Sequence, residues 1–390
     1  MARVLLIAPQ PFYEPRGTPI NVRQMCRALC AAGHEVELAT YPIGQPVAIP
    51  GLRIRRALPI PGIREVPIGF SLRKLALDLS LALLVLRLLL FRRYDVVHAV
   101  EEAALLALPC TWFGARLIYD LDSLISDQLR YSGVLEAPWL LARVRALERL
   151  ALRRSRAAIT VCRSLSDAVR ALHPSAQVFQ IEDAPLDETL REPEPARVEA
   201  LRQELGLVGR PLAVYTGNLE GYQGLELLLD AMQRVAQQLP DAACVVVGGA
   251  GASLAAFRAA LAARGLADHV LAVGAQPPDE ISEWMALGHA LVSPRTQGEN
   301  TPLKLYTYMR ALRPIVATKL ATHTQVLDPS CALLCEPDAD ALAAGLCAAL
   351  AEPAAHRGLA LAARKRVEDE YSAEAFARKL LAAYASVLRG

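Results

Sequence analysis

The sequence has few lysines, few aromatic residues and almost no net charge. Only five of its 42 basic residues are lysine, and aromatic residues make up 5% of the 390 positions. The 42 basic residues face 40 acidic ones, so the formal net charge is +2. Nucleic-acid binding proteins use a basic excess to neutralise phosphates. We therefore expect no nucleic-acid partner.

Zinc and redox sites of the C-x-x-C type are also missing. The closest cysteine pairs, Cys26 with Cys30 and Cys331 with Cys335, are separated by three residues, and the eight cysteines lie in apolar segments. This is typical of buried thiols in a reducing compartment. The apolar run Val4–Ile7 is too short for a signal peptide. We expect a cytoplasmic protein without a metal site.

One long hydrophobic run, Leu72–Tyr94, carries Asp78 and Arg87 in its apolar stretch. These charges make a transmembrane helix costly. Two interpretations stay open. The segment is a buried helix of an α/β domain, or it also rests on the inner face of a membrane. In the second case the cations at the lipid surface are Arg73, Lys74, Arg92 and Arg93.

Hydrophobic residues (53%) and length suit two globular domains. Short β-like runs alternate with helical stretches twice, which predicts an α/β fold with two doubly wound parallel sheets. Strands are expected at 4–8, 35–40, 96–100, 117–119, 158–161 and 177–181, then at 212–215, 243–247, 270–273, 290–292, 315–317 and 332–335. Helices are expected at 22–31, 224–238, 254–263 and 373–388, among others. The predicted domains are 1–184 and 196–372, joined by the Pro-rich segment Pro185–Pro195.

Candidate binding loops follow the predicted strand ends, where doubly wound sheets bind ligands. Pro9–Asn21 contains Gly17, which permits close backbone approach ahead of a helix N-terminus. Tyr215–Gly224 is glycine-rich and suits an anion, although no G-K-[ST] of a P-loop closes it. In Val245–Leu254 a leucine stands where the third glycine of a dinucleotide fingerprint belongs, so no nicotinamide or flavin cofactor is expected.

The segment Ser293–Thr318 is the most informative. A polar loop leads into a helix expected to begin near Thr301 or Pro302, with proline at its first position. Glu299 precedes that helix and is placed to accept hydrogen bonds from vicinal hydroxyls, or else to cap the helix.

The order of several motifs resembles the family 4 glycosyltransferases of the GT-B fold over nearly the whole chain. The motifs are RGTPINVRQMCRALCAAGHEVELATY, YDVVHAVEE, YTGNLEGYQGLELLLDAM, VVVGGAG and the Glu299 segment. The resemblance implies two Rossmann-like domains facing across a cleft, with a closing helix, 373–390, that packs back on the first. It also implies transfer of a sugar, with retention, from a nucleotide diphosphate sugar on the second domain to an acceptor hydroxyl on the first. Neither a cofactor nor a metal is implied.

The resemblance also assigns roles by position. Glu299 would hold the donor sugar, the Asn300–Pro302 stretch would present amides to the diphosphate, and Gly17 would close over the phosphates. The candidate catalytic residues are Glu299, His98 and Asp122. The candidate donor-binding residues are Gly17, Arg16, Gly217, Asn218, Gln223, Arg295, Asn300, Thr301, Lys304 and Thr307.

Three positions depart from the family pattern. Thr307 replaces the second glutamate of E-x7-E, and Val100 replaces a histidine found in many relatives. The Arg and Lys that neutralise the donor diphosphate are replaced by Asn218 and Gln223. Because a departing diphosphate needs compensating donors, we expect other cations to supply them. Those cations are Lys304 and Arg295, with Arg16 in reserve.

Carboxylates that follow strand ends in the first domain are candidates to orient or deprotonate the acceptor, or simply to cap helices. They are Glu101, Glu102, Asp120 and Asp122. The apolar run 72–94 suggests a lipid-linked or polysaccharide acceptor. Two other functions stay open: a sugar-nucleotide epimerase or hydrolase on the same scaffold, and a non-catalytic binding subunit with a decayed donor site.

Overall fold

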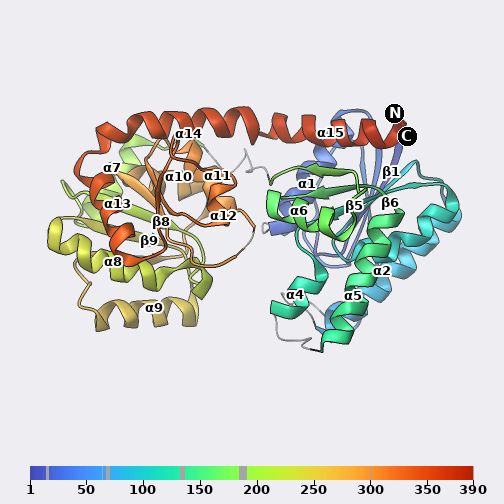
Figure 1. Ribbon diagram of the computed structural model, residues 1–390, viewed down its shortest axis with the longest axis horizontal. Coiled ribbons are helices and arrows are strands. Elements are labelled where there is room, and N and C mark those ends of the chain that lie inside the picture. The colour runs from blue at the N-terminus through green and yellow to red at the C-terminus, as the bar shows by residue number, and fades with distance from the viewer. Residues whose placement is uncertain are drawn as a thin grey trace. The chain divides into compact units, whose positions relative to one another are not determined.

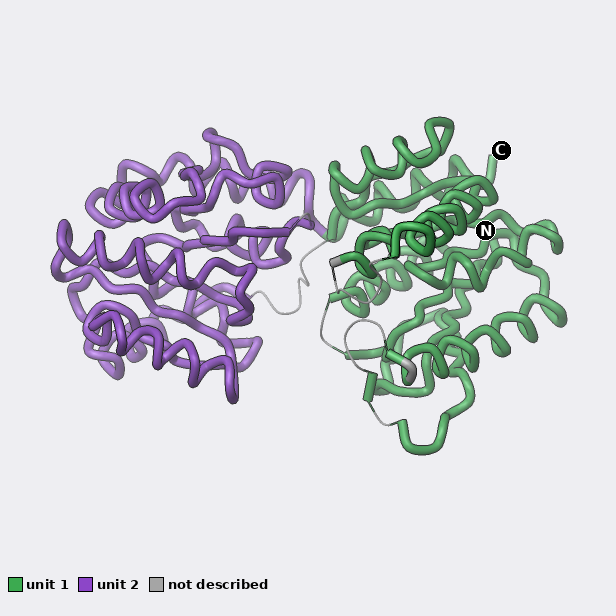
Figure 2. The backbone as a smooth tube through the Cα atoms, turned by 60° about the horizontal axis from the view of Figure 1, so that its bottom comes forward, with its two compact units in different colours: residues 1–184, 373–390 green, residues 185–372 purple. Residues whose placement is uncertain are grey.

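The computed structural model describes residues 1–14, 17–63, 65–66, 71–131, 137–183, 191–298 and 300–389. The chain divides into two compact units (Figure 2). Unit 1 comprises residues 1–184 and 373–390, and unit 2 comprises residues 185–372. Most of the predicted connection, its residues 185–190, lies outside the described residues.

Unit 1 contains a parallel sheet in the order β3-β2-β1-β4-β5-β6-β7. Its strands are β1 (Arg3–Ala8), β2 (Glu35–Thr40), β3 (Leu52–Arg56), β4 (Val96–Val100), β5 (Arg116–Leu121), β6 (Ser155–Thr160) and β7 (Val178–Gln180). The edge strand β3 was not predicted from sequence. Its sequence LRIRR alternates apolar residues with arginine and lacks the continuous apolar run of the central strands.

Helices cover both faces of this sheet (Figure 1). They are α1 (Gly17–Ala31), α2 (Leu72–Phe91), α3 (Ala103–Ala107), η1 (Leu108–Phe113), α4 (Ile125–Tyr131), α5 (Pro138–Arg154), α6 (Arg163–Leu172) and α15 (Ala373–Arg389). Helices α1 and α15 share one core with the strands, and α2, α3, α5 and α6 share the other. Alternate strand residues enable this: Val96 and Val100 of β4 face α1 and α15, whereas Val97 and Ala99 face α2 and α3.

Unit 2 contains a second parallel sheet, in the order β10-β9-β8-β11-β12-β13. Its strands are β8 (Leu212–Thr216), β9 (Ala243–Val247), β10 (Val270–Gly274), β11 (Ala290–Ser293), β12 (Ile315–Thr318) and β13 (Leu333–Cys335). Its helices are α7 (Pro195–Glu204), η3 (Gly221–Gln223), α8 (Leu225–Gln238), α9 (Gly251–Ala263), η4 (Pro278–Glu280), α10 (Ile281–Leu287), α11 (Leu303–Arg310), α12 (Ala321–Thr324), α13 (Ala339–Ala351), η5 (Pro353–His356) and α14 (Arg357–Glu370). Helices α7, α10, α11 and α14 pack on one face, and α8, α9 and α13 on the other.

Three predicted helix starts were wrong. Helix α9 begins at Gly251, three residues before the predicted start. Helix α1 begins at Gly17, five residues before the predicted start, because Pro19 falls in the first turn, where no intrahelical N–H is needed. Helix α11 begins at Leu303, and Pro302 is its N-cap, with an extended ψ of 128°, instead of its first residue. The loop ahead of α1 is therefore shorter than the sequence suggested, whereas the loop ahead of α11 extends to Pro302 and is slightly longer.

The hydrophobic run 72–94 forms α2, which is buried on one face only. Leu77, Leu81 and Val85 enter the core, whereas Leu79 and Leu83 are 65% and 58% exposed. Within the described ranges, no helix is both long and apolar enough to cross a membrane. The prediction of a buried helix is therefore confirmed for one face of α2 and is wrong for the other face.

Strand order reverses in each sheet between β1 and β4 and between β8 and β11. At such a switch point the loops after the two strands turn in opposite directions and leave room at the carboxyl edge for a ligand. The predicted binding loops follow β1, β8, β9 and β11, so three of the four follow strands at these switch points, and the loop after β9 follows the neighbour of β8.

Candidate functional site

At the carboxyl edge of the unit 2 sheet, glycines allow the main chains of neighbouring loops to lie in contact. A Cβ atom at Gly224 would lie 1.9 Å from the Pro294 carbonyl oxygen, and one at Gly248 would lie 1.9 Å from the Gly217 carbonyl oxygen. Both glycines have positive φ, 75° and 129°, which other residues rarely adopt. The loops after β8, β9 and β11 are therefore held against one another as one surface.

Lys304 of α11 reaches into the loop after β8. Its Nζ donates to Oε1 of Gln223 at 3.0 Å and lies 3.9 Å from the centre of the Tyr215 ring. Burial, and secondarily the charge of Arg295, lowers the pKa of Lys304 well below its usual value. The ammonium group thus lies beside Gln223, one of the two positions where the sequence had lost a cation.

Arg295, in the loop after β11, adds a second cation at the same edge. Its guanidinium lies 5.0 Å from the Tyr222 ring centre, and it donates to the carbonyls of Gln297 (2.7 Å) and Asn300 (3.0 Å). Burial lowers its pKa. Asn218 takes part in the same surface, because its carbonyl accepts from Tyr215 Oη at 2.7 Å. Gly217, Asn218, Gln223, Arg295 and Lys304 are therefore brought together.

The start of α11 carries a buried hydroxyl. Thr301 is 9% exposed, and its Oγ1 has no hydrogen-bond partner among the described residues. Asn300 precedes it and offers its carbonyl to Arg295. Glu299 lies outside the described residues. Thr307, one turn further along, lines a separate cavity of about 170 Å³ together with Met285 and Arg310.

A residue that the sequence did not single out, His323 of α12, supports this loop. It is fully buried, and burial lowers its pKa to about 4, so it is neutral. Its Nδ1 donates to the Thr318 carbonyl at 2.7 Å, and its Nε2 accepts from Ser293 Oγ at 2.9 Å. The Thr318 hydroxyl in turn donates to the Arg295 carbonyl. A single histidine in a short helix carries no sequence signal for such a role.

In unit 1 the carboxyl edge is acidic. Thr18, in the first turn of α1, donates to Asp122 after β5 at 2.6 Å, which connects the α1 start to this edge. Gly17 precedes it with φ 39°. Arg16 lies outside the described residues. Burial and the nearby Asp120 raise the pKa of Asp122 to about 7, although the hydrogen bond from Thr18 acts in the opposite direction.

Two further carboxyls share that edge. Glu101, directly after β4, has φ 51°, and burial together with the charge of Asp122 raises its pKa to about 8. Asp183, which follows β7 and was not predicted, also has a raised pKa, owing to burial and to Asp122 and Asp120. Glu102 is neutralised by an ion pair with Lys74 of α2. Carboxyls with raised pKa values are suited to hold and exchange protons near neutral pH.

His98 is placed differently from the other predicted residues. It is fully buried, and its Nδ1 and Nε2 contact Tyr384 Oη of α15 (2.8 Å) and Asp120 Oδ2 (3.2 Å). With the Asp120 carboxylate as acceptor, Nε2 is the donor and Nδ1 accepts from Tyr384 Oη. Through these contacts His98 ties α15 to β4 and β5. Among the described residues, no group of three or more histidine, cysteine or acidic side chains is arranged to hold a metal ion.

Comparison with known proteins agrees with this architecture. Residues 16–181 match the family described as "Glycosyl transferase 4-like domain", and residues 210–352 match "Glycosyl transferases group 1". The alpha-D-kanosaminyltransferase of Streptomyces kanamyceticus is 27% identical over 172 residues, 44% of each chain, so the match spans less than half of that relative.

Solved structures share the fold over the whole chain. Sucrose-phosphate synthase of Thermosynechococcus elongatus superposes with a TM-score of 0.77 at 21% identity, covering 100% of both chains. The Anabaena protein HepE, solved in complex with UDP, has a TM-score of 0.74 at 17% identity and covers 99% of this chain and 100% of its own. The fold is GT-B, as predicted.

Proposed function

Since the chain belongs to the group 1 glycosyltransferases of the GT-B fold, we propose that it transfers a sugar, with retention, from a nucleoside diphosphate sugar to an acceptor hydroxyl. The observation that carries the proposal is the pair of cations, Lys304 and Arg295, at the carboxyl edge of the unit 2 sheet. They supply positive charge at the loop after β8, where the neutral residues Asn218 and Gln223 stand in place of the family's Arg and Lys.

In this proposal unit 2 binds the donor. The diphosphate lies against Lys304 and Arg295, and the Thr301 hydroxyl and the first amides of α11 donate to it. Negative charge grows on the diphosphate as the glycosidic bond breaks, and cations held away from water stabilise that charge strongly. By the family resemblance, we assign Glu299 to the sugar hydroxyls and Gly17 with Arg16 to the phosphates. The UDP bound by HepE supports a uridine or similar nucleotide.

Unit 1 binds the acceptor. Asp122 orients the acceptor hydroxyl and takes its proton, since a carboxyl with a pKa near 7 is suited to general base catalysis at neutral pH. His98 acts as a positioning residue, because its contacts hold Asp120 next to that site. Two side-chain cations already face the diphosphate, so we expect turnover without an added divalent cation.

The exposed face of α2 supports a peripheral contact with a membrane and a lipid-linked or polysaccharide acceptor. Five leucines spaced by three or four residues are 44 to 65% exposed: Leu75, Leu79, Leu83, Leu86 and Leu90. Arg87 is exposed next to this face, Arg73 and Arg93 are exposed at the two ends of the helix, and the only acid of the helix, Asp78, accepts inward from Tyr41. Apolar and basic side chains on one face suit an anionic lipid surface. With eight free thiols, we place the protein in the cytoplasm, at the inner face of the membrane.

A panel of nucleotide sugars tests the proposal through nucleotide release and ligand-induced thermal shift. We expect Lys304→Ala to weaken nucleotide diphosphate binding about tenfold to a hundredfold, because a charge-assisted contact is lost. Lys319→Ala removes a charge from an exposed ion pair in the same unit and should change nothing. If Lys304→Ala and Glu299→Ala both leave binding and turnover unchanged, the site assignment is wrong.

The same experiment separates the other functions. An epimerase or hydrolase would form product without an acceptor, and a binding subunit with a decayed donor site would show no thermal shift even at millimolar nucleotide sugar. The cation pair disfavours the decayed site, because Lys304 and Arg295 both lie at the loops where the donor diphosphate is proposed to bind.

A further inference from the structure

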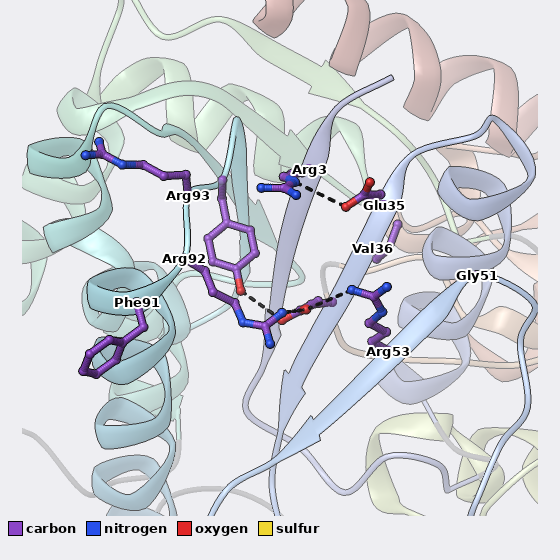
Figure 3. Close-up of a pocket in the computed structure, with 10 residues that line it drawn as sticks. Arg3, Glu35, Val36, Gly51, Arg53, Phe91, Arg92 and Arg93 are labelled. Atoms are coloured by element: carbon purple, nitrogen blue, oxygen red, sulfur yellow. Dashed lines mark hydrogen bonds and ion pairs between the residues drawn. The ribbon is translucent and has the colours of Figure 1, made fainter.

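A pocket lies at the amino edge of the unit 1 sheet, opposite the edge that carries Asp122. Its volume is about 390 Å³, and it is lined by residues at the starts of β1, β2 and β3 and at the end of α2. Figure 3 shows Arg3, Arg53 and Arg92 around the space, with Phe91 and Arg93 turned away from it. None of these residues has a part in the proposed transfer reaction.

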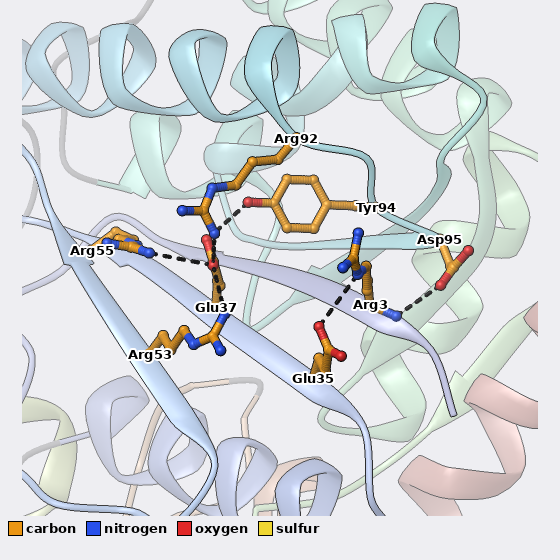
Figure 4. Close-up of polar contacts among 8 residues, drawn as sticks. All are labelled: Arg3, Glu35, Glu37, Arg53, Arg55, Arg92, Tyr94 and Asp95. Carbon is orange, nitrogen blue, oxygen red and sulfur yellow. Dashed lines mark hydrogen bonds and ion pairs between the residues drawn. The ribbon is translucent and has the colours of Figure 1, made fainter.

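The base of the pocket is one buried carboxylate held by three arginines (Figure 4). Glu37 has a side chain only 8% exposed, and it pairs with Arg92, with Arg55 at 3.5 Å and with Arg53 at 3.8 Å. Tyr94 Oη also donates to it at 3.0 Å. Glu37 is therefore fully used as an acceptor by its own neighbours, and it has no free capacity for a cationic ligand.

The arginines outnumber the carboxylates around this space. Three guanidinium groups meet one carboxylate at Glu37, and at the rim Arg3 pairs with Glu35 at 3.3 Å. The side chains of Arg3 and Arg53 remain 63% and 66% exposed. Each guanidinium has five N–H donors, so most donors of these two residues stay available to a ligand. Repulsion among the guanidinium groups falls when a second anion joins Glu37.

We propose that this pocket binds the phosphate group of a phosphorylated ligand through Arg3, Arg53 and Arg92. Guanidinium forks match phosphate oxygens in geometry, and two planar donors from different strands can hold a monoester from two sides. Phe91, the last residue of α2, borders the pocket and is 81% exposed, and the exposed Leu90 precedes it. The phosphate therefore belongs either to a lipid headgroup or to a soluble phosphate ester.

Two probes separate these sources: glycerol 3-phosphate, followed by calorimetry, and phosphatidylcholine vesicles with and without phosphatidic acid, followed by co-sedimentation. The test variant is Arg3→Gln with Arg53→Gln, which keeps Arg92 on Glu37. The matched control, Arg357→Gln with Lys365→Gln on α14, removes the same charge from exposed positions in unit 2. A single Arg53→Glu variant adds a negative charge at the pocket without touching Arg3.

We expect the wild type and the control to bind at least one probe, and both pocket variants to bind it about tenfold more weakly or worse. Binding of glycerol 3-phosphate identifies a soluble ester, and binding only to phosphatidic acid vesicles identifies a lipid headgroup. Equal loss in the control and the pocket variants, or no binding of either probe by the wild type, overturns the proposal. The pocket variants should keep their affinity for UDP, so the result is independent of the proposed transferase activity.

Discussion

At the scale of single residues, the candidate site depends on buried ionisable groups whose charged forms are destabilised by desolvation. Lys304 is the clearest case, because burial and Arg295 both disfavour its protonated form. A bound diphosphate reverses this by placing negative charge beside the ammonium group. Donor binding therefore stabilises the protonated form of Lys304, which burial destabilises in the free protein.

This coupling predicts a pH dependence of donor binding. The pKa of Lys304 is lowered in the free protein and rises in the complex, so binding takes up a proton at any pH between the two values. Affinity for UDP should be full below the lower pKa and should fall as the pH rises through this interval. Calorimetry in two buffers of different ionisation heat measures the uptake. Lys304→Met should show none, and an unchanged uptake in that variant would contradict the assignment.

A second pH dependence is expected at Asp122. As general base it must be ionised, so kcat should rise with pH through about 7. The Thr18 hydroxyl stabilises the ionised carboxylate, and Thr18→Val should therefore shift this acid limb of the pH profile to higher pH. Asp122→Asn should lower kcat about a hundredfold. A pH profile that Thr18→Val leaves in place would argue against this role.

Removing Glu37 should destabilise unit 1. Glu37→Ala leaves Arg53, Arg55 and Arg92 without their common carboxylate. We expect the free energy of unfolding to fall by about 1 to 3 kcal/mol, less than for a fully buried ion pair, because the arginines are partly exposed. Urea denaturation measures it. Glu35→Ala, at the exposed rim, should change the free energy of unfolding by less than about 0.5 kcal/mol.

At the scale of elements, α15 belongs to unit 1 although it closes the chain. Phe376, Leu380 and Tyr384 fill the core beside α1, and Tyr384 also donates to His98. Tyr384→Phe should cost about 1 to 2 kcal/mol in urea denaturation, since a buried imidazole nitrogen loses its donor. Ser386→Ala on the exposed side of the same helix should be nearly neutral. Equal values for the two variants would mean that the His98 contact does not hold α15.

The outer face of α2 should matter for vesicle binding and not for folding. Leu79→Gln with Leu83→Gln changes two side chains that are more than half exposed, so we expect less than about 0.5 kcal/mol per site in stability. Co-sedimentation with anionic vesicles should decrease several-fold. The control variant Leu77→Gln changes a residue of the buried face, so it should lower the free energy of unfolding. If Leu77→Gln lost vesicle binding and the Leu79→Gln, Leu83→Gln variant kept it, the membrane contact would be refuted.

At the scale of the whole molecule, each unit has its own sheet and its own pair of cores. The donor residues Gly217, Arg295 and Lys304 all belong to unit 2. UDP at a hundred times its dissociation constant should therefore stabilise unit 2 by about 2.7 kcal/mol. In calorimetry, the unfolding of unit 2 should move to higher temperature in the wild type and not in Lys304→Ala. A shift confined to unit 1 would place the nucleotide elsewhere.

The sequence alone determined the fold class and twelve of the strands, because parallel strands buried on both faces appear as continuous apolar runs such as Ala243–Val247. It did not show β3, in which arginines alternate with apolar residues, or the exact starts of α1, α9 and α11. It also identified Lys304 and Arg295 as cations to consider. Only the tertiary structure decided that Lys304 reaches Gln223, that His98 is enclosed by Tyr384, and that three arginines converge on Glu37. These contacts join residues 16 to 286 positions apart, and chain packing, not local pattern, sets which side chains meet over such separations.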